Sequence, residues 1–450
     1  PMPVRTAWIL VMAAAVVSAA ITNLADPLVP MTDTSVTADG AASSLTRTVL
    51  ATDRSAYRIS NAAVEDNFNQ VYGPGHLTTN IYSSLENLGY SDVWLNAFYN
   101  NQRNRNSSIL RTTYNILFNS FMGNKYMITD KTEVEGYVKT VSKGGLNLFE
   151  NKTAYPLGFV TYKTIGRAAY DRLPAYDRTM ALMECAVTDS ADSSSSASDD
   201  YSSALTLLNK NHYIIADARV SRAVASGNTV VFKKAVTTAI HIDASPGSIL
   251  LVSLNVTNEN SPAASSGMGS SVGKSKRDVK IKLAGKQNDL TDPASRYSNG
   301  NTCFNYVVTA TGSGVYKLNL SKGKYRMSDL KIAVVPEKKL TDLRSSVSGM
   351  KNISVNRYGT CISGTVTAAK AGYFVATIPW SGNFTIYVDG KETNCFKTDL
   401  AFTGTPVSAG THKIKIVYRN DIQIIGGIMS LAGAAYLAAL LLYDRRRKIQ

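Results

Sequence analysis

The sequence is poor in the residues that build metal centres and disulfide frameworks. Its 450 residues include four scattered histidines and four cysteines, which are Cys185, Cys303, Cys361 and Cys395. A zinc site needs cysteines or histidines at defined spacings, and these spacings fit none, so we predict no metal site. Four cysteines allow three disulfide pairings. We favour a bridge between Cys361 and Cys395, because both lie in one small C-terminal segment.

Signatures of nucleotide binding and of nucleophilic catalysis are also missing. The sequence has no Walker loop and no GxGxxG motif between a strand and a helix, and the glycines of residues 71–76 flank Pro74, which is typical of a turn. No GxSxG nucleophile elbow occurs. The neighbouring acids Glu65 and Asp66 would point apart in an extended chain, so they form no acid–base pair. We therefore predict no catalytic residue in this chain, no cofactor and no nucleic-acid partner.

Long apolar runs are present, and the longer one lies near the end of the sequence. Residues 422–443 form an uncharged stretch of 22 residues, and a helix of about 20 apolar residues crosses the hydrocarbon core of a bilayer. A basic cluster follows directly: Arg445, Arg446, Arg447 and Lys448. Such clusters mark the cytoplasmic end of a span. We predict a transmembrane helix over 422–443, a cytoplasmic basic tail over 444–450, and an extracytoplasmic position for the chain before them.

A second uncharged stretch, residues 7–24, follows Arg5 near the start of the sequence. Arg5 on the cytoplasmic side would again place the following chain outside. Two interpretations remain open: a transmembrane helix or signal anchor, for which 18 residues are just enough, and a cleavable signal peptide with small residues at 18–20. We favour the transmembrane helix. Because the sequence opens with Pro1-Met2-Pro3, we expect the natural protein to extend further upstream.

The region between the two runs is basic and long. The net formal charge of +15 comes only in small part from Arg5 and the C-terminal cluster. This charge either serves solubility or attracts anionic surfaces, such as lipid headgroups and phosphate-rich polymers. The predicted partners are the lipid bilayer and, with it, anionic cell-envelope polymers or glycans. Almost 400 residues are too many for one ordinary domain, so several are expected.

Composition divides this region into segments. A linker rich in Ala, Ser and Thr is expected over 28–50, a mixed α/β domain over 51–180, and a low-complexity linker over 189–203. A β-sandwich domain over 204–337 and a small β domain over 351–420 follow. The predicted fold is mainly β with a mixed α/β N-terminal part, and its sandwich-like domains lie between two transmembrane helices.

The β prediction rests on short runs of β-branched residues, such as 249–256, that turn residues separate without helical spacers. Apolar residues at helical spacing after polar caps predict a helix within 106–119, and 338–350 is expected to form a short connecting helix. The pair Asp389-Gly390 lies between two apolar runs, which predicts a tight hairpin turn.

Four aromatic residues are candidates for stacking on sugar rings: Tyr90, Trp94, Tyr99 and Trp380. The alternative for each is a place in the aromatic core of a β domain, since large aromatic side chains dominate burial energies. We expect Trp380 and Phe402 to supply much of the core of the small C-terminal domain.

Several blocks of this sequence resemble one protein family, most clearly just before the C-terminal span. The motifs are Ile378-Pro379-Trp380, Val388-Asp389-Gly390-Lys391, Ala401-Phe402, Gly404 and Gly410-Thr411-His412, and further blocks lie at 57–59, 120–128, 148–159 and 323–332. They are similar to the C-terminal part of the YfhO family, in which the first motif typically reads IPYDKGW. The chain departs from that motif where Ser381-Gly382-Asn383 replaces its aspartate and lysine and Phe384 replaces its tryptophan.

The resemblance implies a role in glycosylation. YfhO proteins are bacterial membrane proteins with many spans, and they are classed with the GT-C glycosyltransferases, whose catalytic carboxylate lies on an early loop of the membrane core. This chain then looks like the extracytoplasmic C-terminal portion of such a protein in a bacterial cell membrane, with the polytopic catalytic core upstream. The implied donor is a polyprenyl-phosphate sugar, and the implied acceptor is a surface polymer such as teichoic or lipoteichoic acid. The alternative is a membrane-anchored, non-enzymatic β-domain protein that binds glycans or protein partners.

Overall fold

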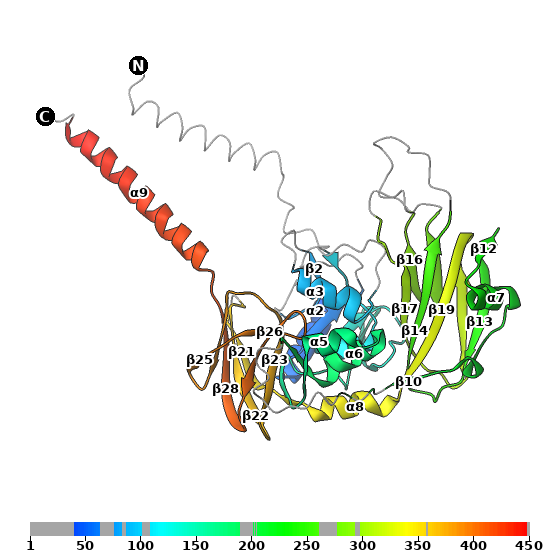
Figure 1. Cartoon of the computed structure of the whole chain (residues 1–450). Coiled ribbons are helices and arrows are strands. Elements are labelled where there is room, and N and C mark those ends of the chain that lie inside the picture. Colours follow the sequence, from blue (N-terminus) through cyan, green and yellow to red (C-terminus); the bar gives the residue numbers. More distant parts are fainter. Residues whose placement is uncertain are drawn as a thin grey trace, which may run out of the picture.

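The computed structural model describes residues 40–63, 76–82, 87–100, 109–189, 201, 203, 205–260, 277–292, 298–356 and 359–447. In this part the chain is mainly β, as predicted, with two β-sandwiches and a smaller sheet gathered around a central core (Figure 1). The predicted N-terminal span at 7–24, Arg5, Lys448 and most of the predicted linker at 189–203 lie outside the described residues.

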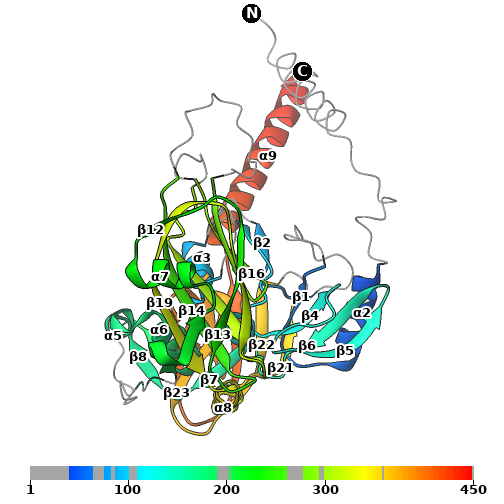
Figure 2. The same cartoon turned by 90° about the vertical axis from the view of Figure 1, so that its right-hand side faces the viewer.

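The N-terminal part is a four-stranded sheet in the order β1-β4-β6-β5, formed by β1 (Arg58–Asn61), β4 (Asn124–Thr129), β5 (Val138–Lys143) and β6 (Leu146–Glu150). Helix α2 (Ala41–Thr52) covers one face and buries Leu45 and Val49 against this sheet (Figure 2). Residues 41–50 are thus helical where the sequence suggested a linker. The reason is tertiary, because apolar side chains four residues apart gain a surface to pack against.

Residues 206–335 form two five-stranded sheets that share one apolar core, and we call this pair of sheets the first sandwich (Figure 1). Its first sheet consists of β10 (Thr206–Leu207), β12 (Thr229–Phe232), β14 (Ile249–Asn258), β17 (Cys303–Thr309) and β19 (Gly323–Val335). Its second sheet consists of β11 (Tyr213–Ile215), β13 (Val236–Ile242), β15 (Val279–Leu283), β16 (Lys286–Leu290) and β18 (Val315–Leu320), and a short 3₁₀ turn, η3 (Lys210–His212), precedes β11. Strand β14 is buried on both sides: Leu250 and Val252 face the sandwich core, whereas Ile249 and Leu251 face the central core. This sandwich is therefore tied to the rest of the molecule.

Helix α7 (Ala218–Ser226) interrupts the strands of this sandwich, where no helical spacer was expected. The residues that cap its two ends explain why this helix forms. The Asp217 carboxylate accepts hydrogen bonds from the N–H groups of Arg219 and Val220, and Gly227 ends the helix with a φ of 64°. An N-cap aspartate followed by a C-terminal glycine is a start-and-stop signal that the sequence did carry.

The second sandwich joins C-terminal strands to strands from the first half of the chain. One sheet has the order β20-β7-β23-β27-β26-β9-β8, formed by β7 (Gly158–Thr161), β8 (Thr164–Gly166), β9 (Ala186–Thr188), β20 (Ser348–Gly349), β23 (Gly372–Pro379), β26 (Phe396–Thr398) and β27 (Phe402–Val407). The other has the order β21-β22-β28-β24-β25, formed by β21 (Lys351–Val355), β22 (Cys361–Ala368), β24 (Phe384–Val388), β25 (Lys391–Thr393) and β28 (Gly410–Tyr418). The strands of the predicted domain at 351–420 therefore do not complete this sandwich alone.

The predicted bridge between Cys361 and Cys395 is absent, because both are free thiols in this structure. Cys361 opens β22, whereas Cys395 follows β25, and β28 and β24 lie between those two strands in the sheet. Neighbouring strands are about 4.8 Å apart, and a disulfide needs Cα atoms closer than about 7 Å. With two strands between them, Cys361 and Cys395 are too far apart to form a bridge.

The central core contains short helices and two short strands. These are α3 (Leu88–Asp92), the π-helix η1 (Val93–Ala97), α4 (Ile116–Phe121), α5 (Arg167–Arg172), α6 (Ala175–Glu184), α8 (Glu337–Ser346), β2 (Ile81–Tyr82) and β3 (Ile109–Leu110). The helix expected within 106–119 begins only at Ile116, because the Asn115 side chain caps it there. Phe121 packs at 5.3 Å on Phe98, 5.7 Å on Phe402 and 6.3 Å on Phe159, which links the helices to the second sandwich.

Helix α9 (Asp421–Arg447) stands away from the folded body (Figures 1 and 2). Its stretch Ile425–Tyr443 is the single segment among the described residues that is long and apolar enough to cross a membrane, and none of it is buried. It coincides with the C-terminal span predicted over 422–443. Arg445, Arg446 and Arg447 lie in the last turns of the helix.

Candidate functional site

Two polar cavities adjoin where the central helices meet the sandwich of residues 206–335, and we call the pair the polar cleft. The smaller cavity has a volume of about 490 Å³ and the larger one about 820 Å³. Tyr99 and Asn305 line both, so they stand at the boundary between the two cavities. A volume of this order suits a ligand of one to a few sugar rings.

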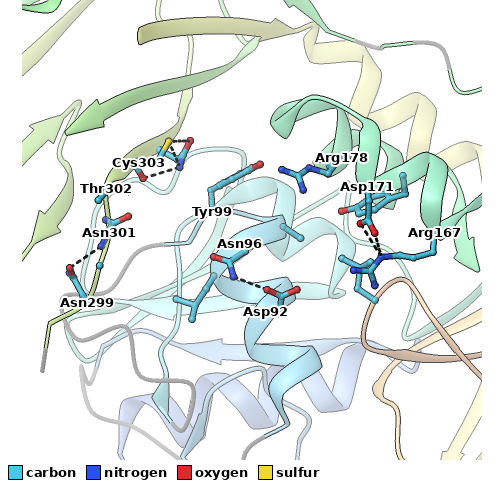
Figure 3. Close-up of a pocket in the computed structure, with 16 residues that line it drawn as sticks. Asp92, Asn96, Tyr99, Arg167, Asp171, Arg178, Asn299, Asn301, Thr302 and Cys303 are labelled. Atoms are coloured by element: carbon cyan, nitrogen blue, oxygen red, sulfur yellow. Dashed lines mark hydrogen bonds and ion pairs between the residues drawn. The ribbon is translucent and has the colours of Figure 1, made fainter. Parts of the chain in front are cut away.

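The smaller cavity is lined by amide, guanidinium and carboxylate groups from three parts of the chain (Figure 3): Asn96, Arg167, Asp171, Arg178, Asn299 and Asn301. Two pairs are fixed by contacts between residues four positions apart. The Asn96 amide donates to Asp92 at 2.7 Å, and the Arg167 Nε donates to both carboxylate oxygens of Asp171 at 2.8 and 2.9 Å. These contacts hold the polar groups in place before any ligand arrives.

Tyr99 projects into the cleft from an unusual piece of backbone. It follows the π-helix η1, and its backbone φ is 54°, a value that residues other than glycine seldom adopt. Its ring packs edge-on against Tyr176 with centroids 5.7 Å apart, and Figure 3 shows its hydroxyl turned toward Arg178. Burial raises the pKa of Tyr99 to about 12, so the hydroxyl stays neutral. Strained residues and π-helices concentrate at functional sites.

Buried donor atoms at the cleft without a hydrogen-bond acceptor in the described part of the chain include the indole N–H of Trp94 and the side-chain nitrogen of Asn100, at the larger cavity, and the Nε of Arg178, at the smaller one. The rest of the Arg178 guanidinium interacts with the Tyr99 hydroxyl. Leaving a buried donor unpaired costs about 1–3 kcal/mol. A ligand that brings hydroxyl or phosphate oxygens would recover part of this cost.

The cleft is closed on one side by a contact between the sandwich and helix α6. The Tyr176 hydroxyl donates to the Asn305 side-chain oxygen at 3.2 Å, and the Asn305 amide donates to the Cys303 carbonyl at 3.1 Å. Thr179, one turn further along α6, donates to the Ala97 carbonyl at 2.7 Å. The helices and the sandwich edge are thus held together by side chains at the cleft itself.

The larger cavity carries cationic groups. The Lys131 ammonium lies 3.6 Å from the centre of the Tyr114 ring, and Lys286 pairs with Glu135 at 2.8 Å. Burial, followed by the nearby Lys286, lowers the pKa of Lys131. A cation over a ring, next to a second cation, would gain from an anionic group in the cavity.

The structure separates the four aromatic residues predicted to stack on sugars. Tyr99 and Trp94 line the cleft, but Trp94 is only 1% exposed, so both faces of its ring are covered. Tyr90 is buried and donates its hydroxyl hydrogen to the Thr79 carbonyl at 3.0 Å. Trp380 is half-buried elsewhere, and its carbonyl accepts from the Asn87 amide at 3.3 Å. Of the four, only Tyr99 has a ring placed to stack on a ligand in the cleft, whereas Trp94 can offer only its N–H. For Tyr90 and Trp94 the packing supports the alternative of a core position.

No pattern in the sequence indicated that the arginines and asparagines of the cleft would meet. Arg178 lies on a helix, and Asn305 on a strand more than a hundred positions later. The one local feature of the cleft in the sequence is the polar run Asn299-Gly300-Asn301, and such a run is typical of any surface loop, so it does not indicate a site. The described residues hold no group of three or more His, Cys, Asp or Glu side chains that could bind a metal ion.

A family model described as bacterial membrane protein YfhO matches residues 29–430 of this chain. The chain belongs to the YfhO family. This membership agrees with the motifs around Trp380 and Gly390, and with a helix able to span a membrane at the C-terminus. No curated protein matches the chain.

Solved structures with partial similarity include three of the arabinofuranosyltransferase AftD from Mycobacteria, two of them of a mutant. Their sequence identities to this YfhO-family chain are 13%, 9% and 8%, and their TM-scores are 0.17, 0.15 and 0.15. The alignments cover 36%, 44% and 43% of this chain but only 14%, 22% and 22% of the AftD chains. Such low TM-scores carry no argument about shared architecture or activity.

Proposed function

We propose that this chain is an extracytoplasmic portion of a membrane glycosyltransferase of the YfhO family, and that its polar cleft holds the glycan chain of a surface-polymer acceptor. The sugar would come from a polyprenyl-phosphate donor, and a membrane core upstream of this region would transfer it. Teichoic or lipoteichoic acid is the acceptor class that we expect. Family membership and the membrane helix support the setting, and the cleft supports the role in binding.

The observation that carries this proposal is the set of side chains that converge at Tyr99. A sugar presents hydroxyl groups that both donate and accept hydrogen bonds, and amide side chains such as Asn96 and Asn305 do the same. Arg178 adds a guanidinium that lies beside the Tyr99 hydroxyl and whose buried Nε has no hydrogen-bond acceptor among the described residues. Because these groups come from the central helices and the sandwich, the cleft can contact a ligand from two sides.

The C-terminal helix supports the proposed orientation. Arg445, Arg446 and Arg447 end α9, and clustered arginines favour the cytoplasmic side of a span. The folded body lies at the opposite end of α9, where β28 precedes it (Figure 1). The body, and the cleft with it, would then face the cell envelope, where surface polymers are assembled.

The cleft is tested by binding of lipoteichoic acid, with and without its sugar substituents, to the full chain in neutral lipid nanodiscs. We expect Tyr99→Ala and Arg178→Gln each to weaken binding of the glycosylated polymer at least about tenfold, or roughly 1.4 kcal/mol. Tyr99→Phe keeps the ring and should retain more affinity than Tyr99→Ala. Arg172→Gln, an exposed arginine on the neighbouring helix α5, serves as the control.

Several outcomes would contradict the proposal. One is wild-type affinity in folded Tyr99→Ala and Arg178→Gln variants. Another is equal binding of the polymers with and without sugars. Turnover of a polyprenyl-phosphate sugar by the purified chain would show that catalytic residues lie within residues 1–450, against the prediction that they lie upstream. Binding without any contribution to transfer in a complete family member would instead favour a surface protein that only binds glycans.

A further inference from the structure

We infer that the outer face of the five-stranded sheet β21-β22-β28-β24-β25 is a second binding site, one that takes a soluble polymer of phosphodiester-linked units. This face, which we call the basic sheet face, contains a shallow hollow of about 640 Å³. The side chains that matter are Ser363, Thr365, Tyr387, Lys413 and Lys415. The sheet lies at the left of the molecule in Figure 1, whereas the sandwich that borders the polar cleft lies at the right.

The alternation of β28 directs its lysines to this face. Ile414 and Ile416 are buried in the core of the second sandwich, so the residues between and before them point the other way. Lys413 and Lys415 are both exposed. Residues two positions apart on a strand are about 7 Å apart, which places two ammonium groups in a row along the strand.

Neighbouring strands place hydroxyl groups beside each lysine. Lys415 lies opposite Ser363 on β22 and opposite Tyr387 on β24, and Lys413 lies opposite Thr365. Lys351 on β21 pairs with Thr365 and extends the same row. Lys415 therefore stands next to the hydroxyl groups of Ser363 and Tyr387, and a cation beside a hydroxyl donor is the combination that phosphate oxygens prefer. The Thr365 hydroxyl beside Lys413 donates weakly to the Lys351 carbonyl, at 3.5 Å.

The lysines of this face have no carboxylate within ion-pair distance among the described side chains, although Asp389 and Lys413 attract each other over a longer distance. Within the described residues, no ion pair involves Lys351, Lys413 or Lys415. The nearest carboxylate on the turn, that of Asp389, is engaged by the His412 Nδ1 and by the Lys413 backbone N–H, both at 2.8 Å. Glu392, opposite Tyr387, is the one acid on the edge strand β25. The face is thus positive overall and complementary to a polyanion.

A soluble polymer fits this face better than a lipid surface does. A peripheral membrane site needs apolar side chains that insert below the headgroups. Between residues 351 and 420, Val355 is the one large apolar side chain that is more than about a third exposed in the described part, at 39%. Two cations in a row along one strand match a polymer that carries one negative charge on each short repeat unit. A single phosphate would use only one of them.

The site lies close to the membrane anchor, because only two residues separate the end of β28 at Tyr418 from the start of α9 at Asp421. A polymer bound here would be held near the bilayer while its sugar-bearing part lies in the cleft. The inference rests on the proposed function only for the natural source of the polymer, because the face and its charges exist independently of any transfer reaction.

The test uses the full chain in neutral lipid nanodiscs and poly(glycerol phosphate) without sugar substituents as the probe. The double variant Lys413→Gln/Lys415→Gln should weaken binding at least about tenfold. It should also reduce the slope of log affinity against log salt by roughly two, as expected when two phosphate contacts are lost. The matched control is Lys317→Gln/Lys331→Gln, which removes two exposed lysines from the other sandwich. The control should leave both quantities unchanged.

The site is rejected if the wild type does not bind the polymer, or if the control pair loses as much affinity as the Lys413/Lys415 pair. Tighter binding to vesicles of an anionic phospholipid than to the polymer would identify a lipid surface and also reject it. Failure of the polar-cleft proposal is distinguishable. The probe carries no sugar, so Arg178→Gln should not change its binding, whereas a loss with Arg178→Gln that equals the loss with the Lys413/Lys415 pair would place the polymer in the cleft and reject the basic sheet face as its site.

Discussion

Asp399, at the turn between β26 and β27, is a carboxyl group held where its charge is unfavourable. One carboxyl oxygen accepts a hydrogen bond from the Val187 N–H at 2.7 Å, and the other is buried without a partner in the described part of the structure. Asp399 and Leu400 both have left-handed backbone, with φ of 47° and 69°. Burial raises the pKa of Asp399 to about 8, from 3.8 for the free group. The neutral acid is therefore the form that fits the fold.

This shift predicts a pH-dependent effect of Asp399→Asn. As pH rises from about 4 to 8, the unfolded chain loses this proton while the folded chain keeps it, so the stability that the group provides at low pH is lost. Each pH unit in that window costs the wild type up to about 1.4 kcal/mol. Asparagine also tolerates the left-handed backbone. We therefore expect the melting temperature of the variant, relative to wild type, to rise between pH 5 and pH 7.5.

Thermal melts at the two pH values measure this difference. Asp342→Asn, which replaces an exposed aspartate on α8, should show no such change with pH. A difference between Asp399→Asn and wild type that stays constant across the window would mean that Asp399 is already ionised in the folded protein.

Among the elements, the hairpin β24–β25 shows how a local signal fixes a turn. Asp389 and Gly390 form its two-residue loop with φ of 52° and 82°, and Val388 pairs with Lys391, as the Asp-Gly pair predicted. Two positive φ values in succession match the twist of the flanking strands. No atom lies within 4 Å of where a Cβ would stand on Gly390, so the demand for glycine is conformational and not steric.

Gly390→Ala should therefore lower the free energy of unfolding by about 1–2 kcal/mol, the cost of left-handed backbone in an L-residue. The matched control is Gly382→Ala, because that site is equally open but has no positive φ. Urea unfolding of both variants, compared at constant m-value, measures the difference. Equal midpoints for the two variants would show that this turn adopts another conformation in solution.

For the whole molecule, the second sandwich depends on strands that lie far apart in the sequence. Val160 of β7 pairs with Phe374 of β23, and Thr188 of β9 pairs with Thr398 of β26. Phe402, expected to fill the core of a C-terminal domain, is fully buried but packs against Phe121 in the central core. Trp380 is only half-buried. The C-terminal strands thus complete a structure that begins more than two hundred residues earlier.

We accordingly expect that a fragment of residues 350–420 does not fold cooperatively. Without β7, β8, β9 and β20, its larger sheet loses four of seven strands and exposes Phe374 and Phe402. A chain of this size has little core to spare. Thermal melts followed by near-UV circular dichroism, with residues 40–420 as the reference, test this. A cooperative transition in the short fragment would show that the C-terminal strands form a domain by themselves.

The sequence alone determined those features that depend on neighbouring residues. The run of apolar and β-branched residues at 249–256 predicted a strand, the Asp389-Gly390 pair predicted a hairpin turn, and an uncharged run followed by arginines predicted α9. Motifs read in order along the chain identified the YfhO family. These signals are local because strand alternation, turn geometry and helix length are properties of short segments.

Only the tertiary structure decided which distant residues meet. Residues 41–50 became a helix because a sheet covers Leu45 and Val49, and Trp94 became a core residue because the central helices close around it. The polar cleft exists because packing brings Tyr99, Arg178 and Asn305 together from three separate elements. The spacing of such residues along the chain carries no trace of this arrangement, since the contacts form through packing between elements and not through any local preference of the backbone.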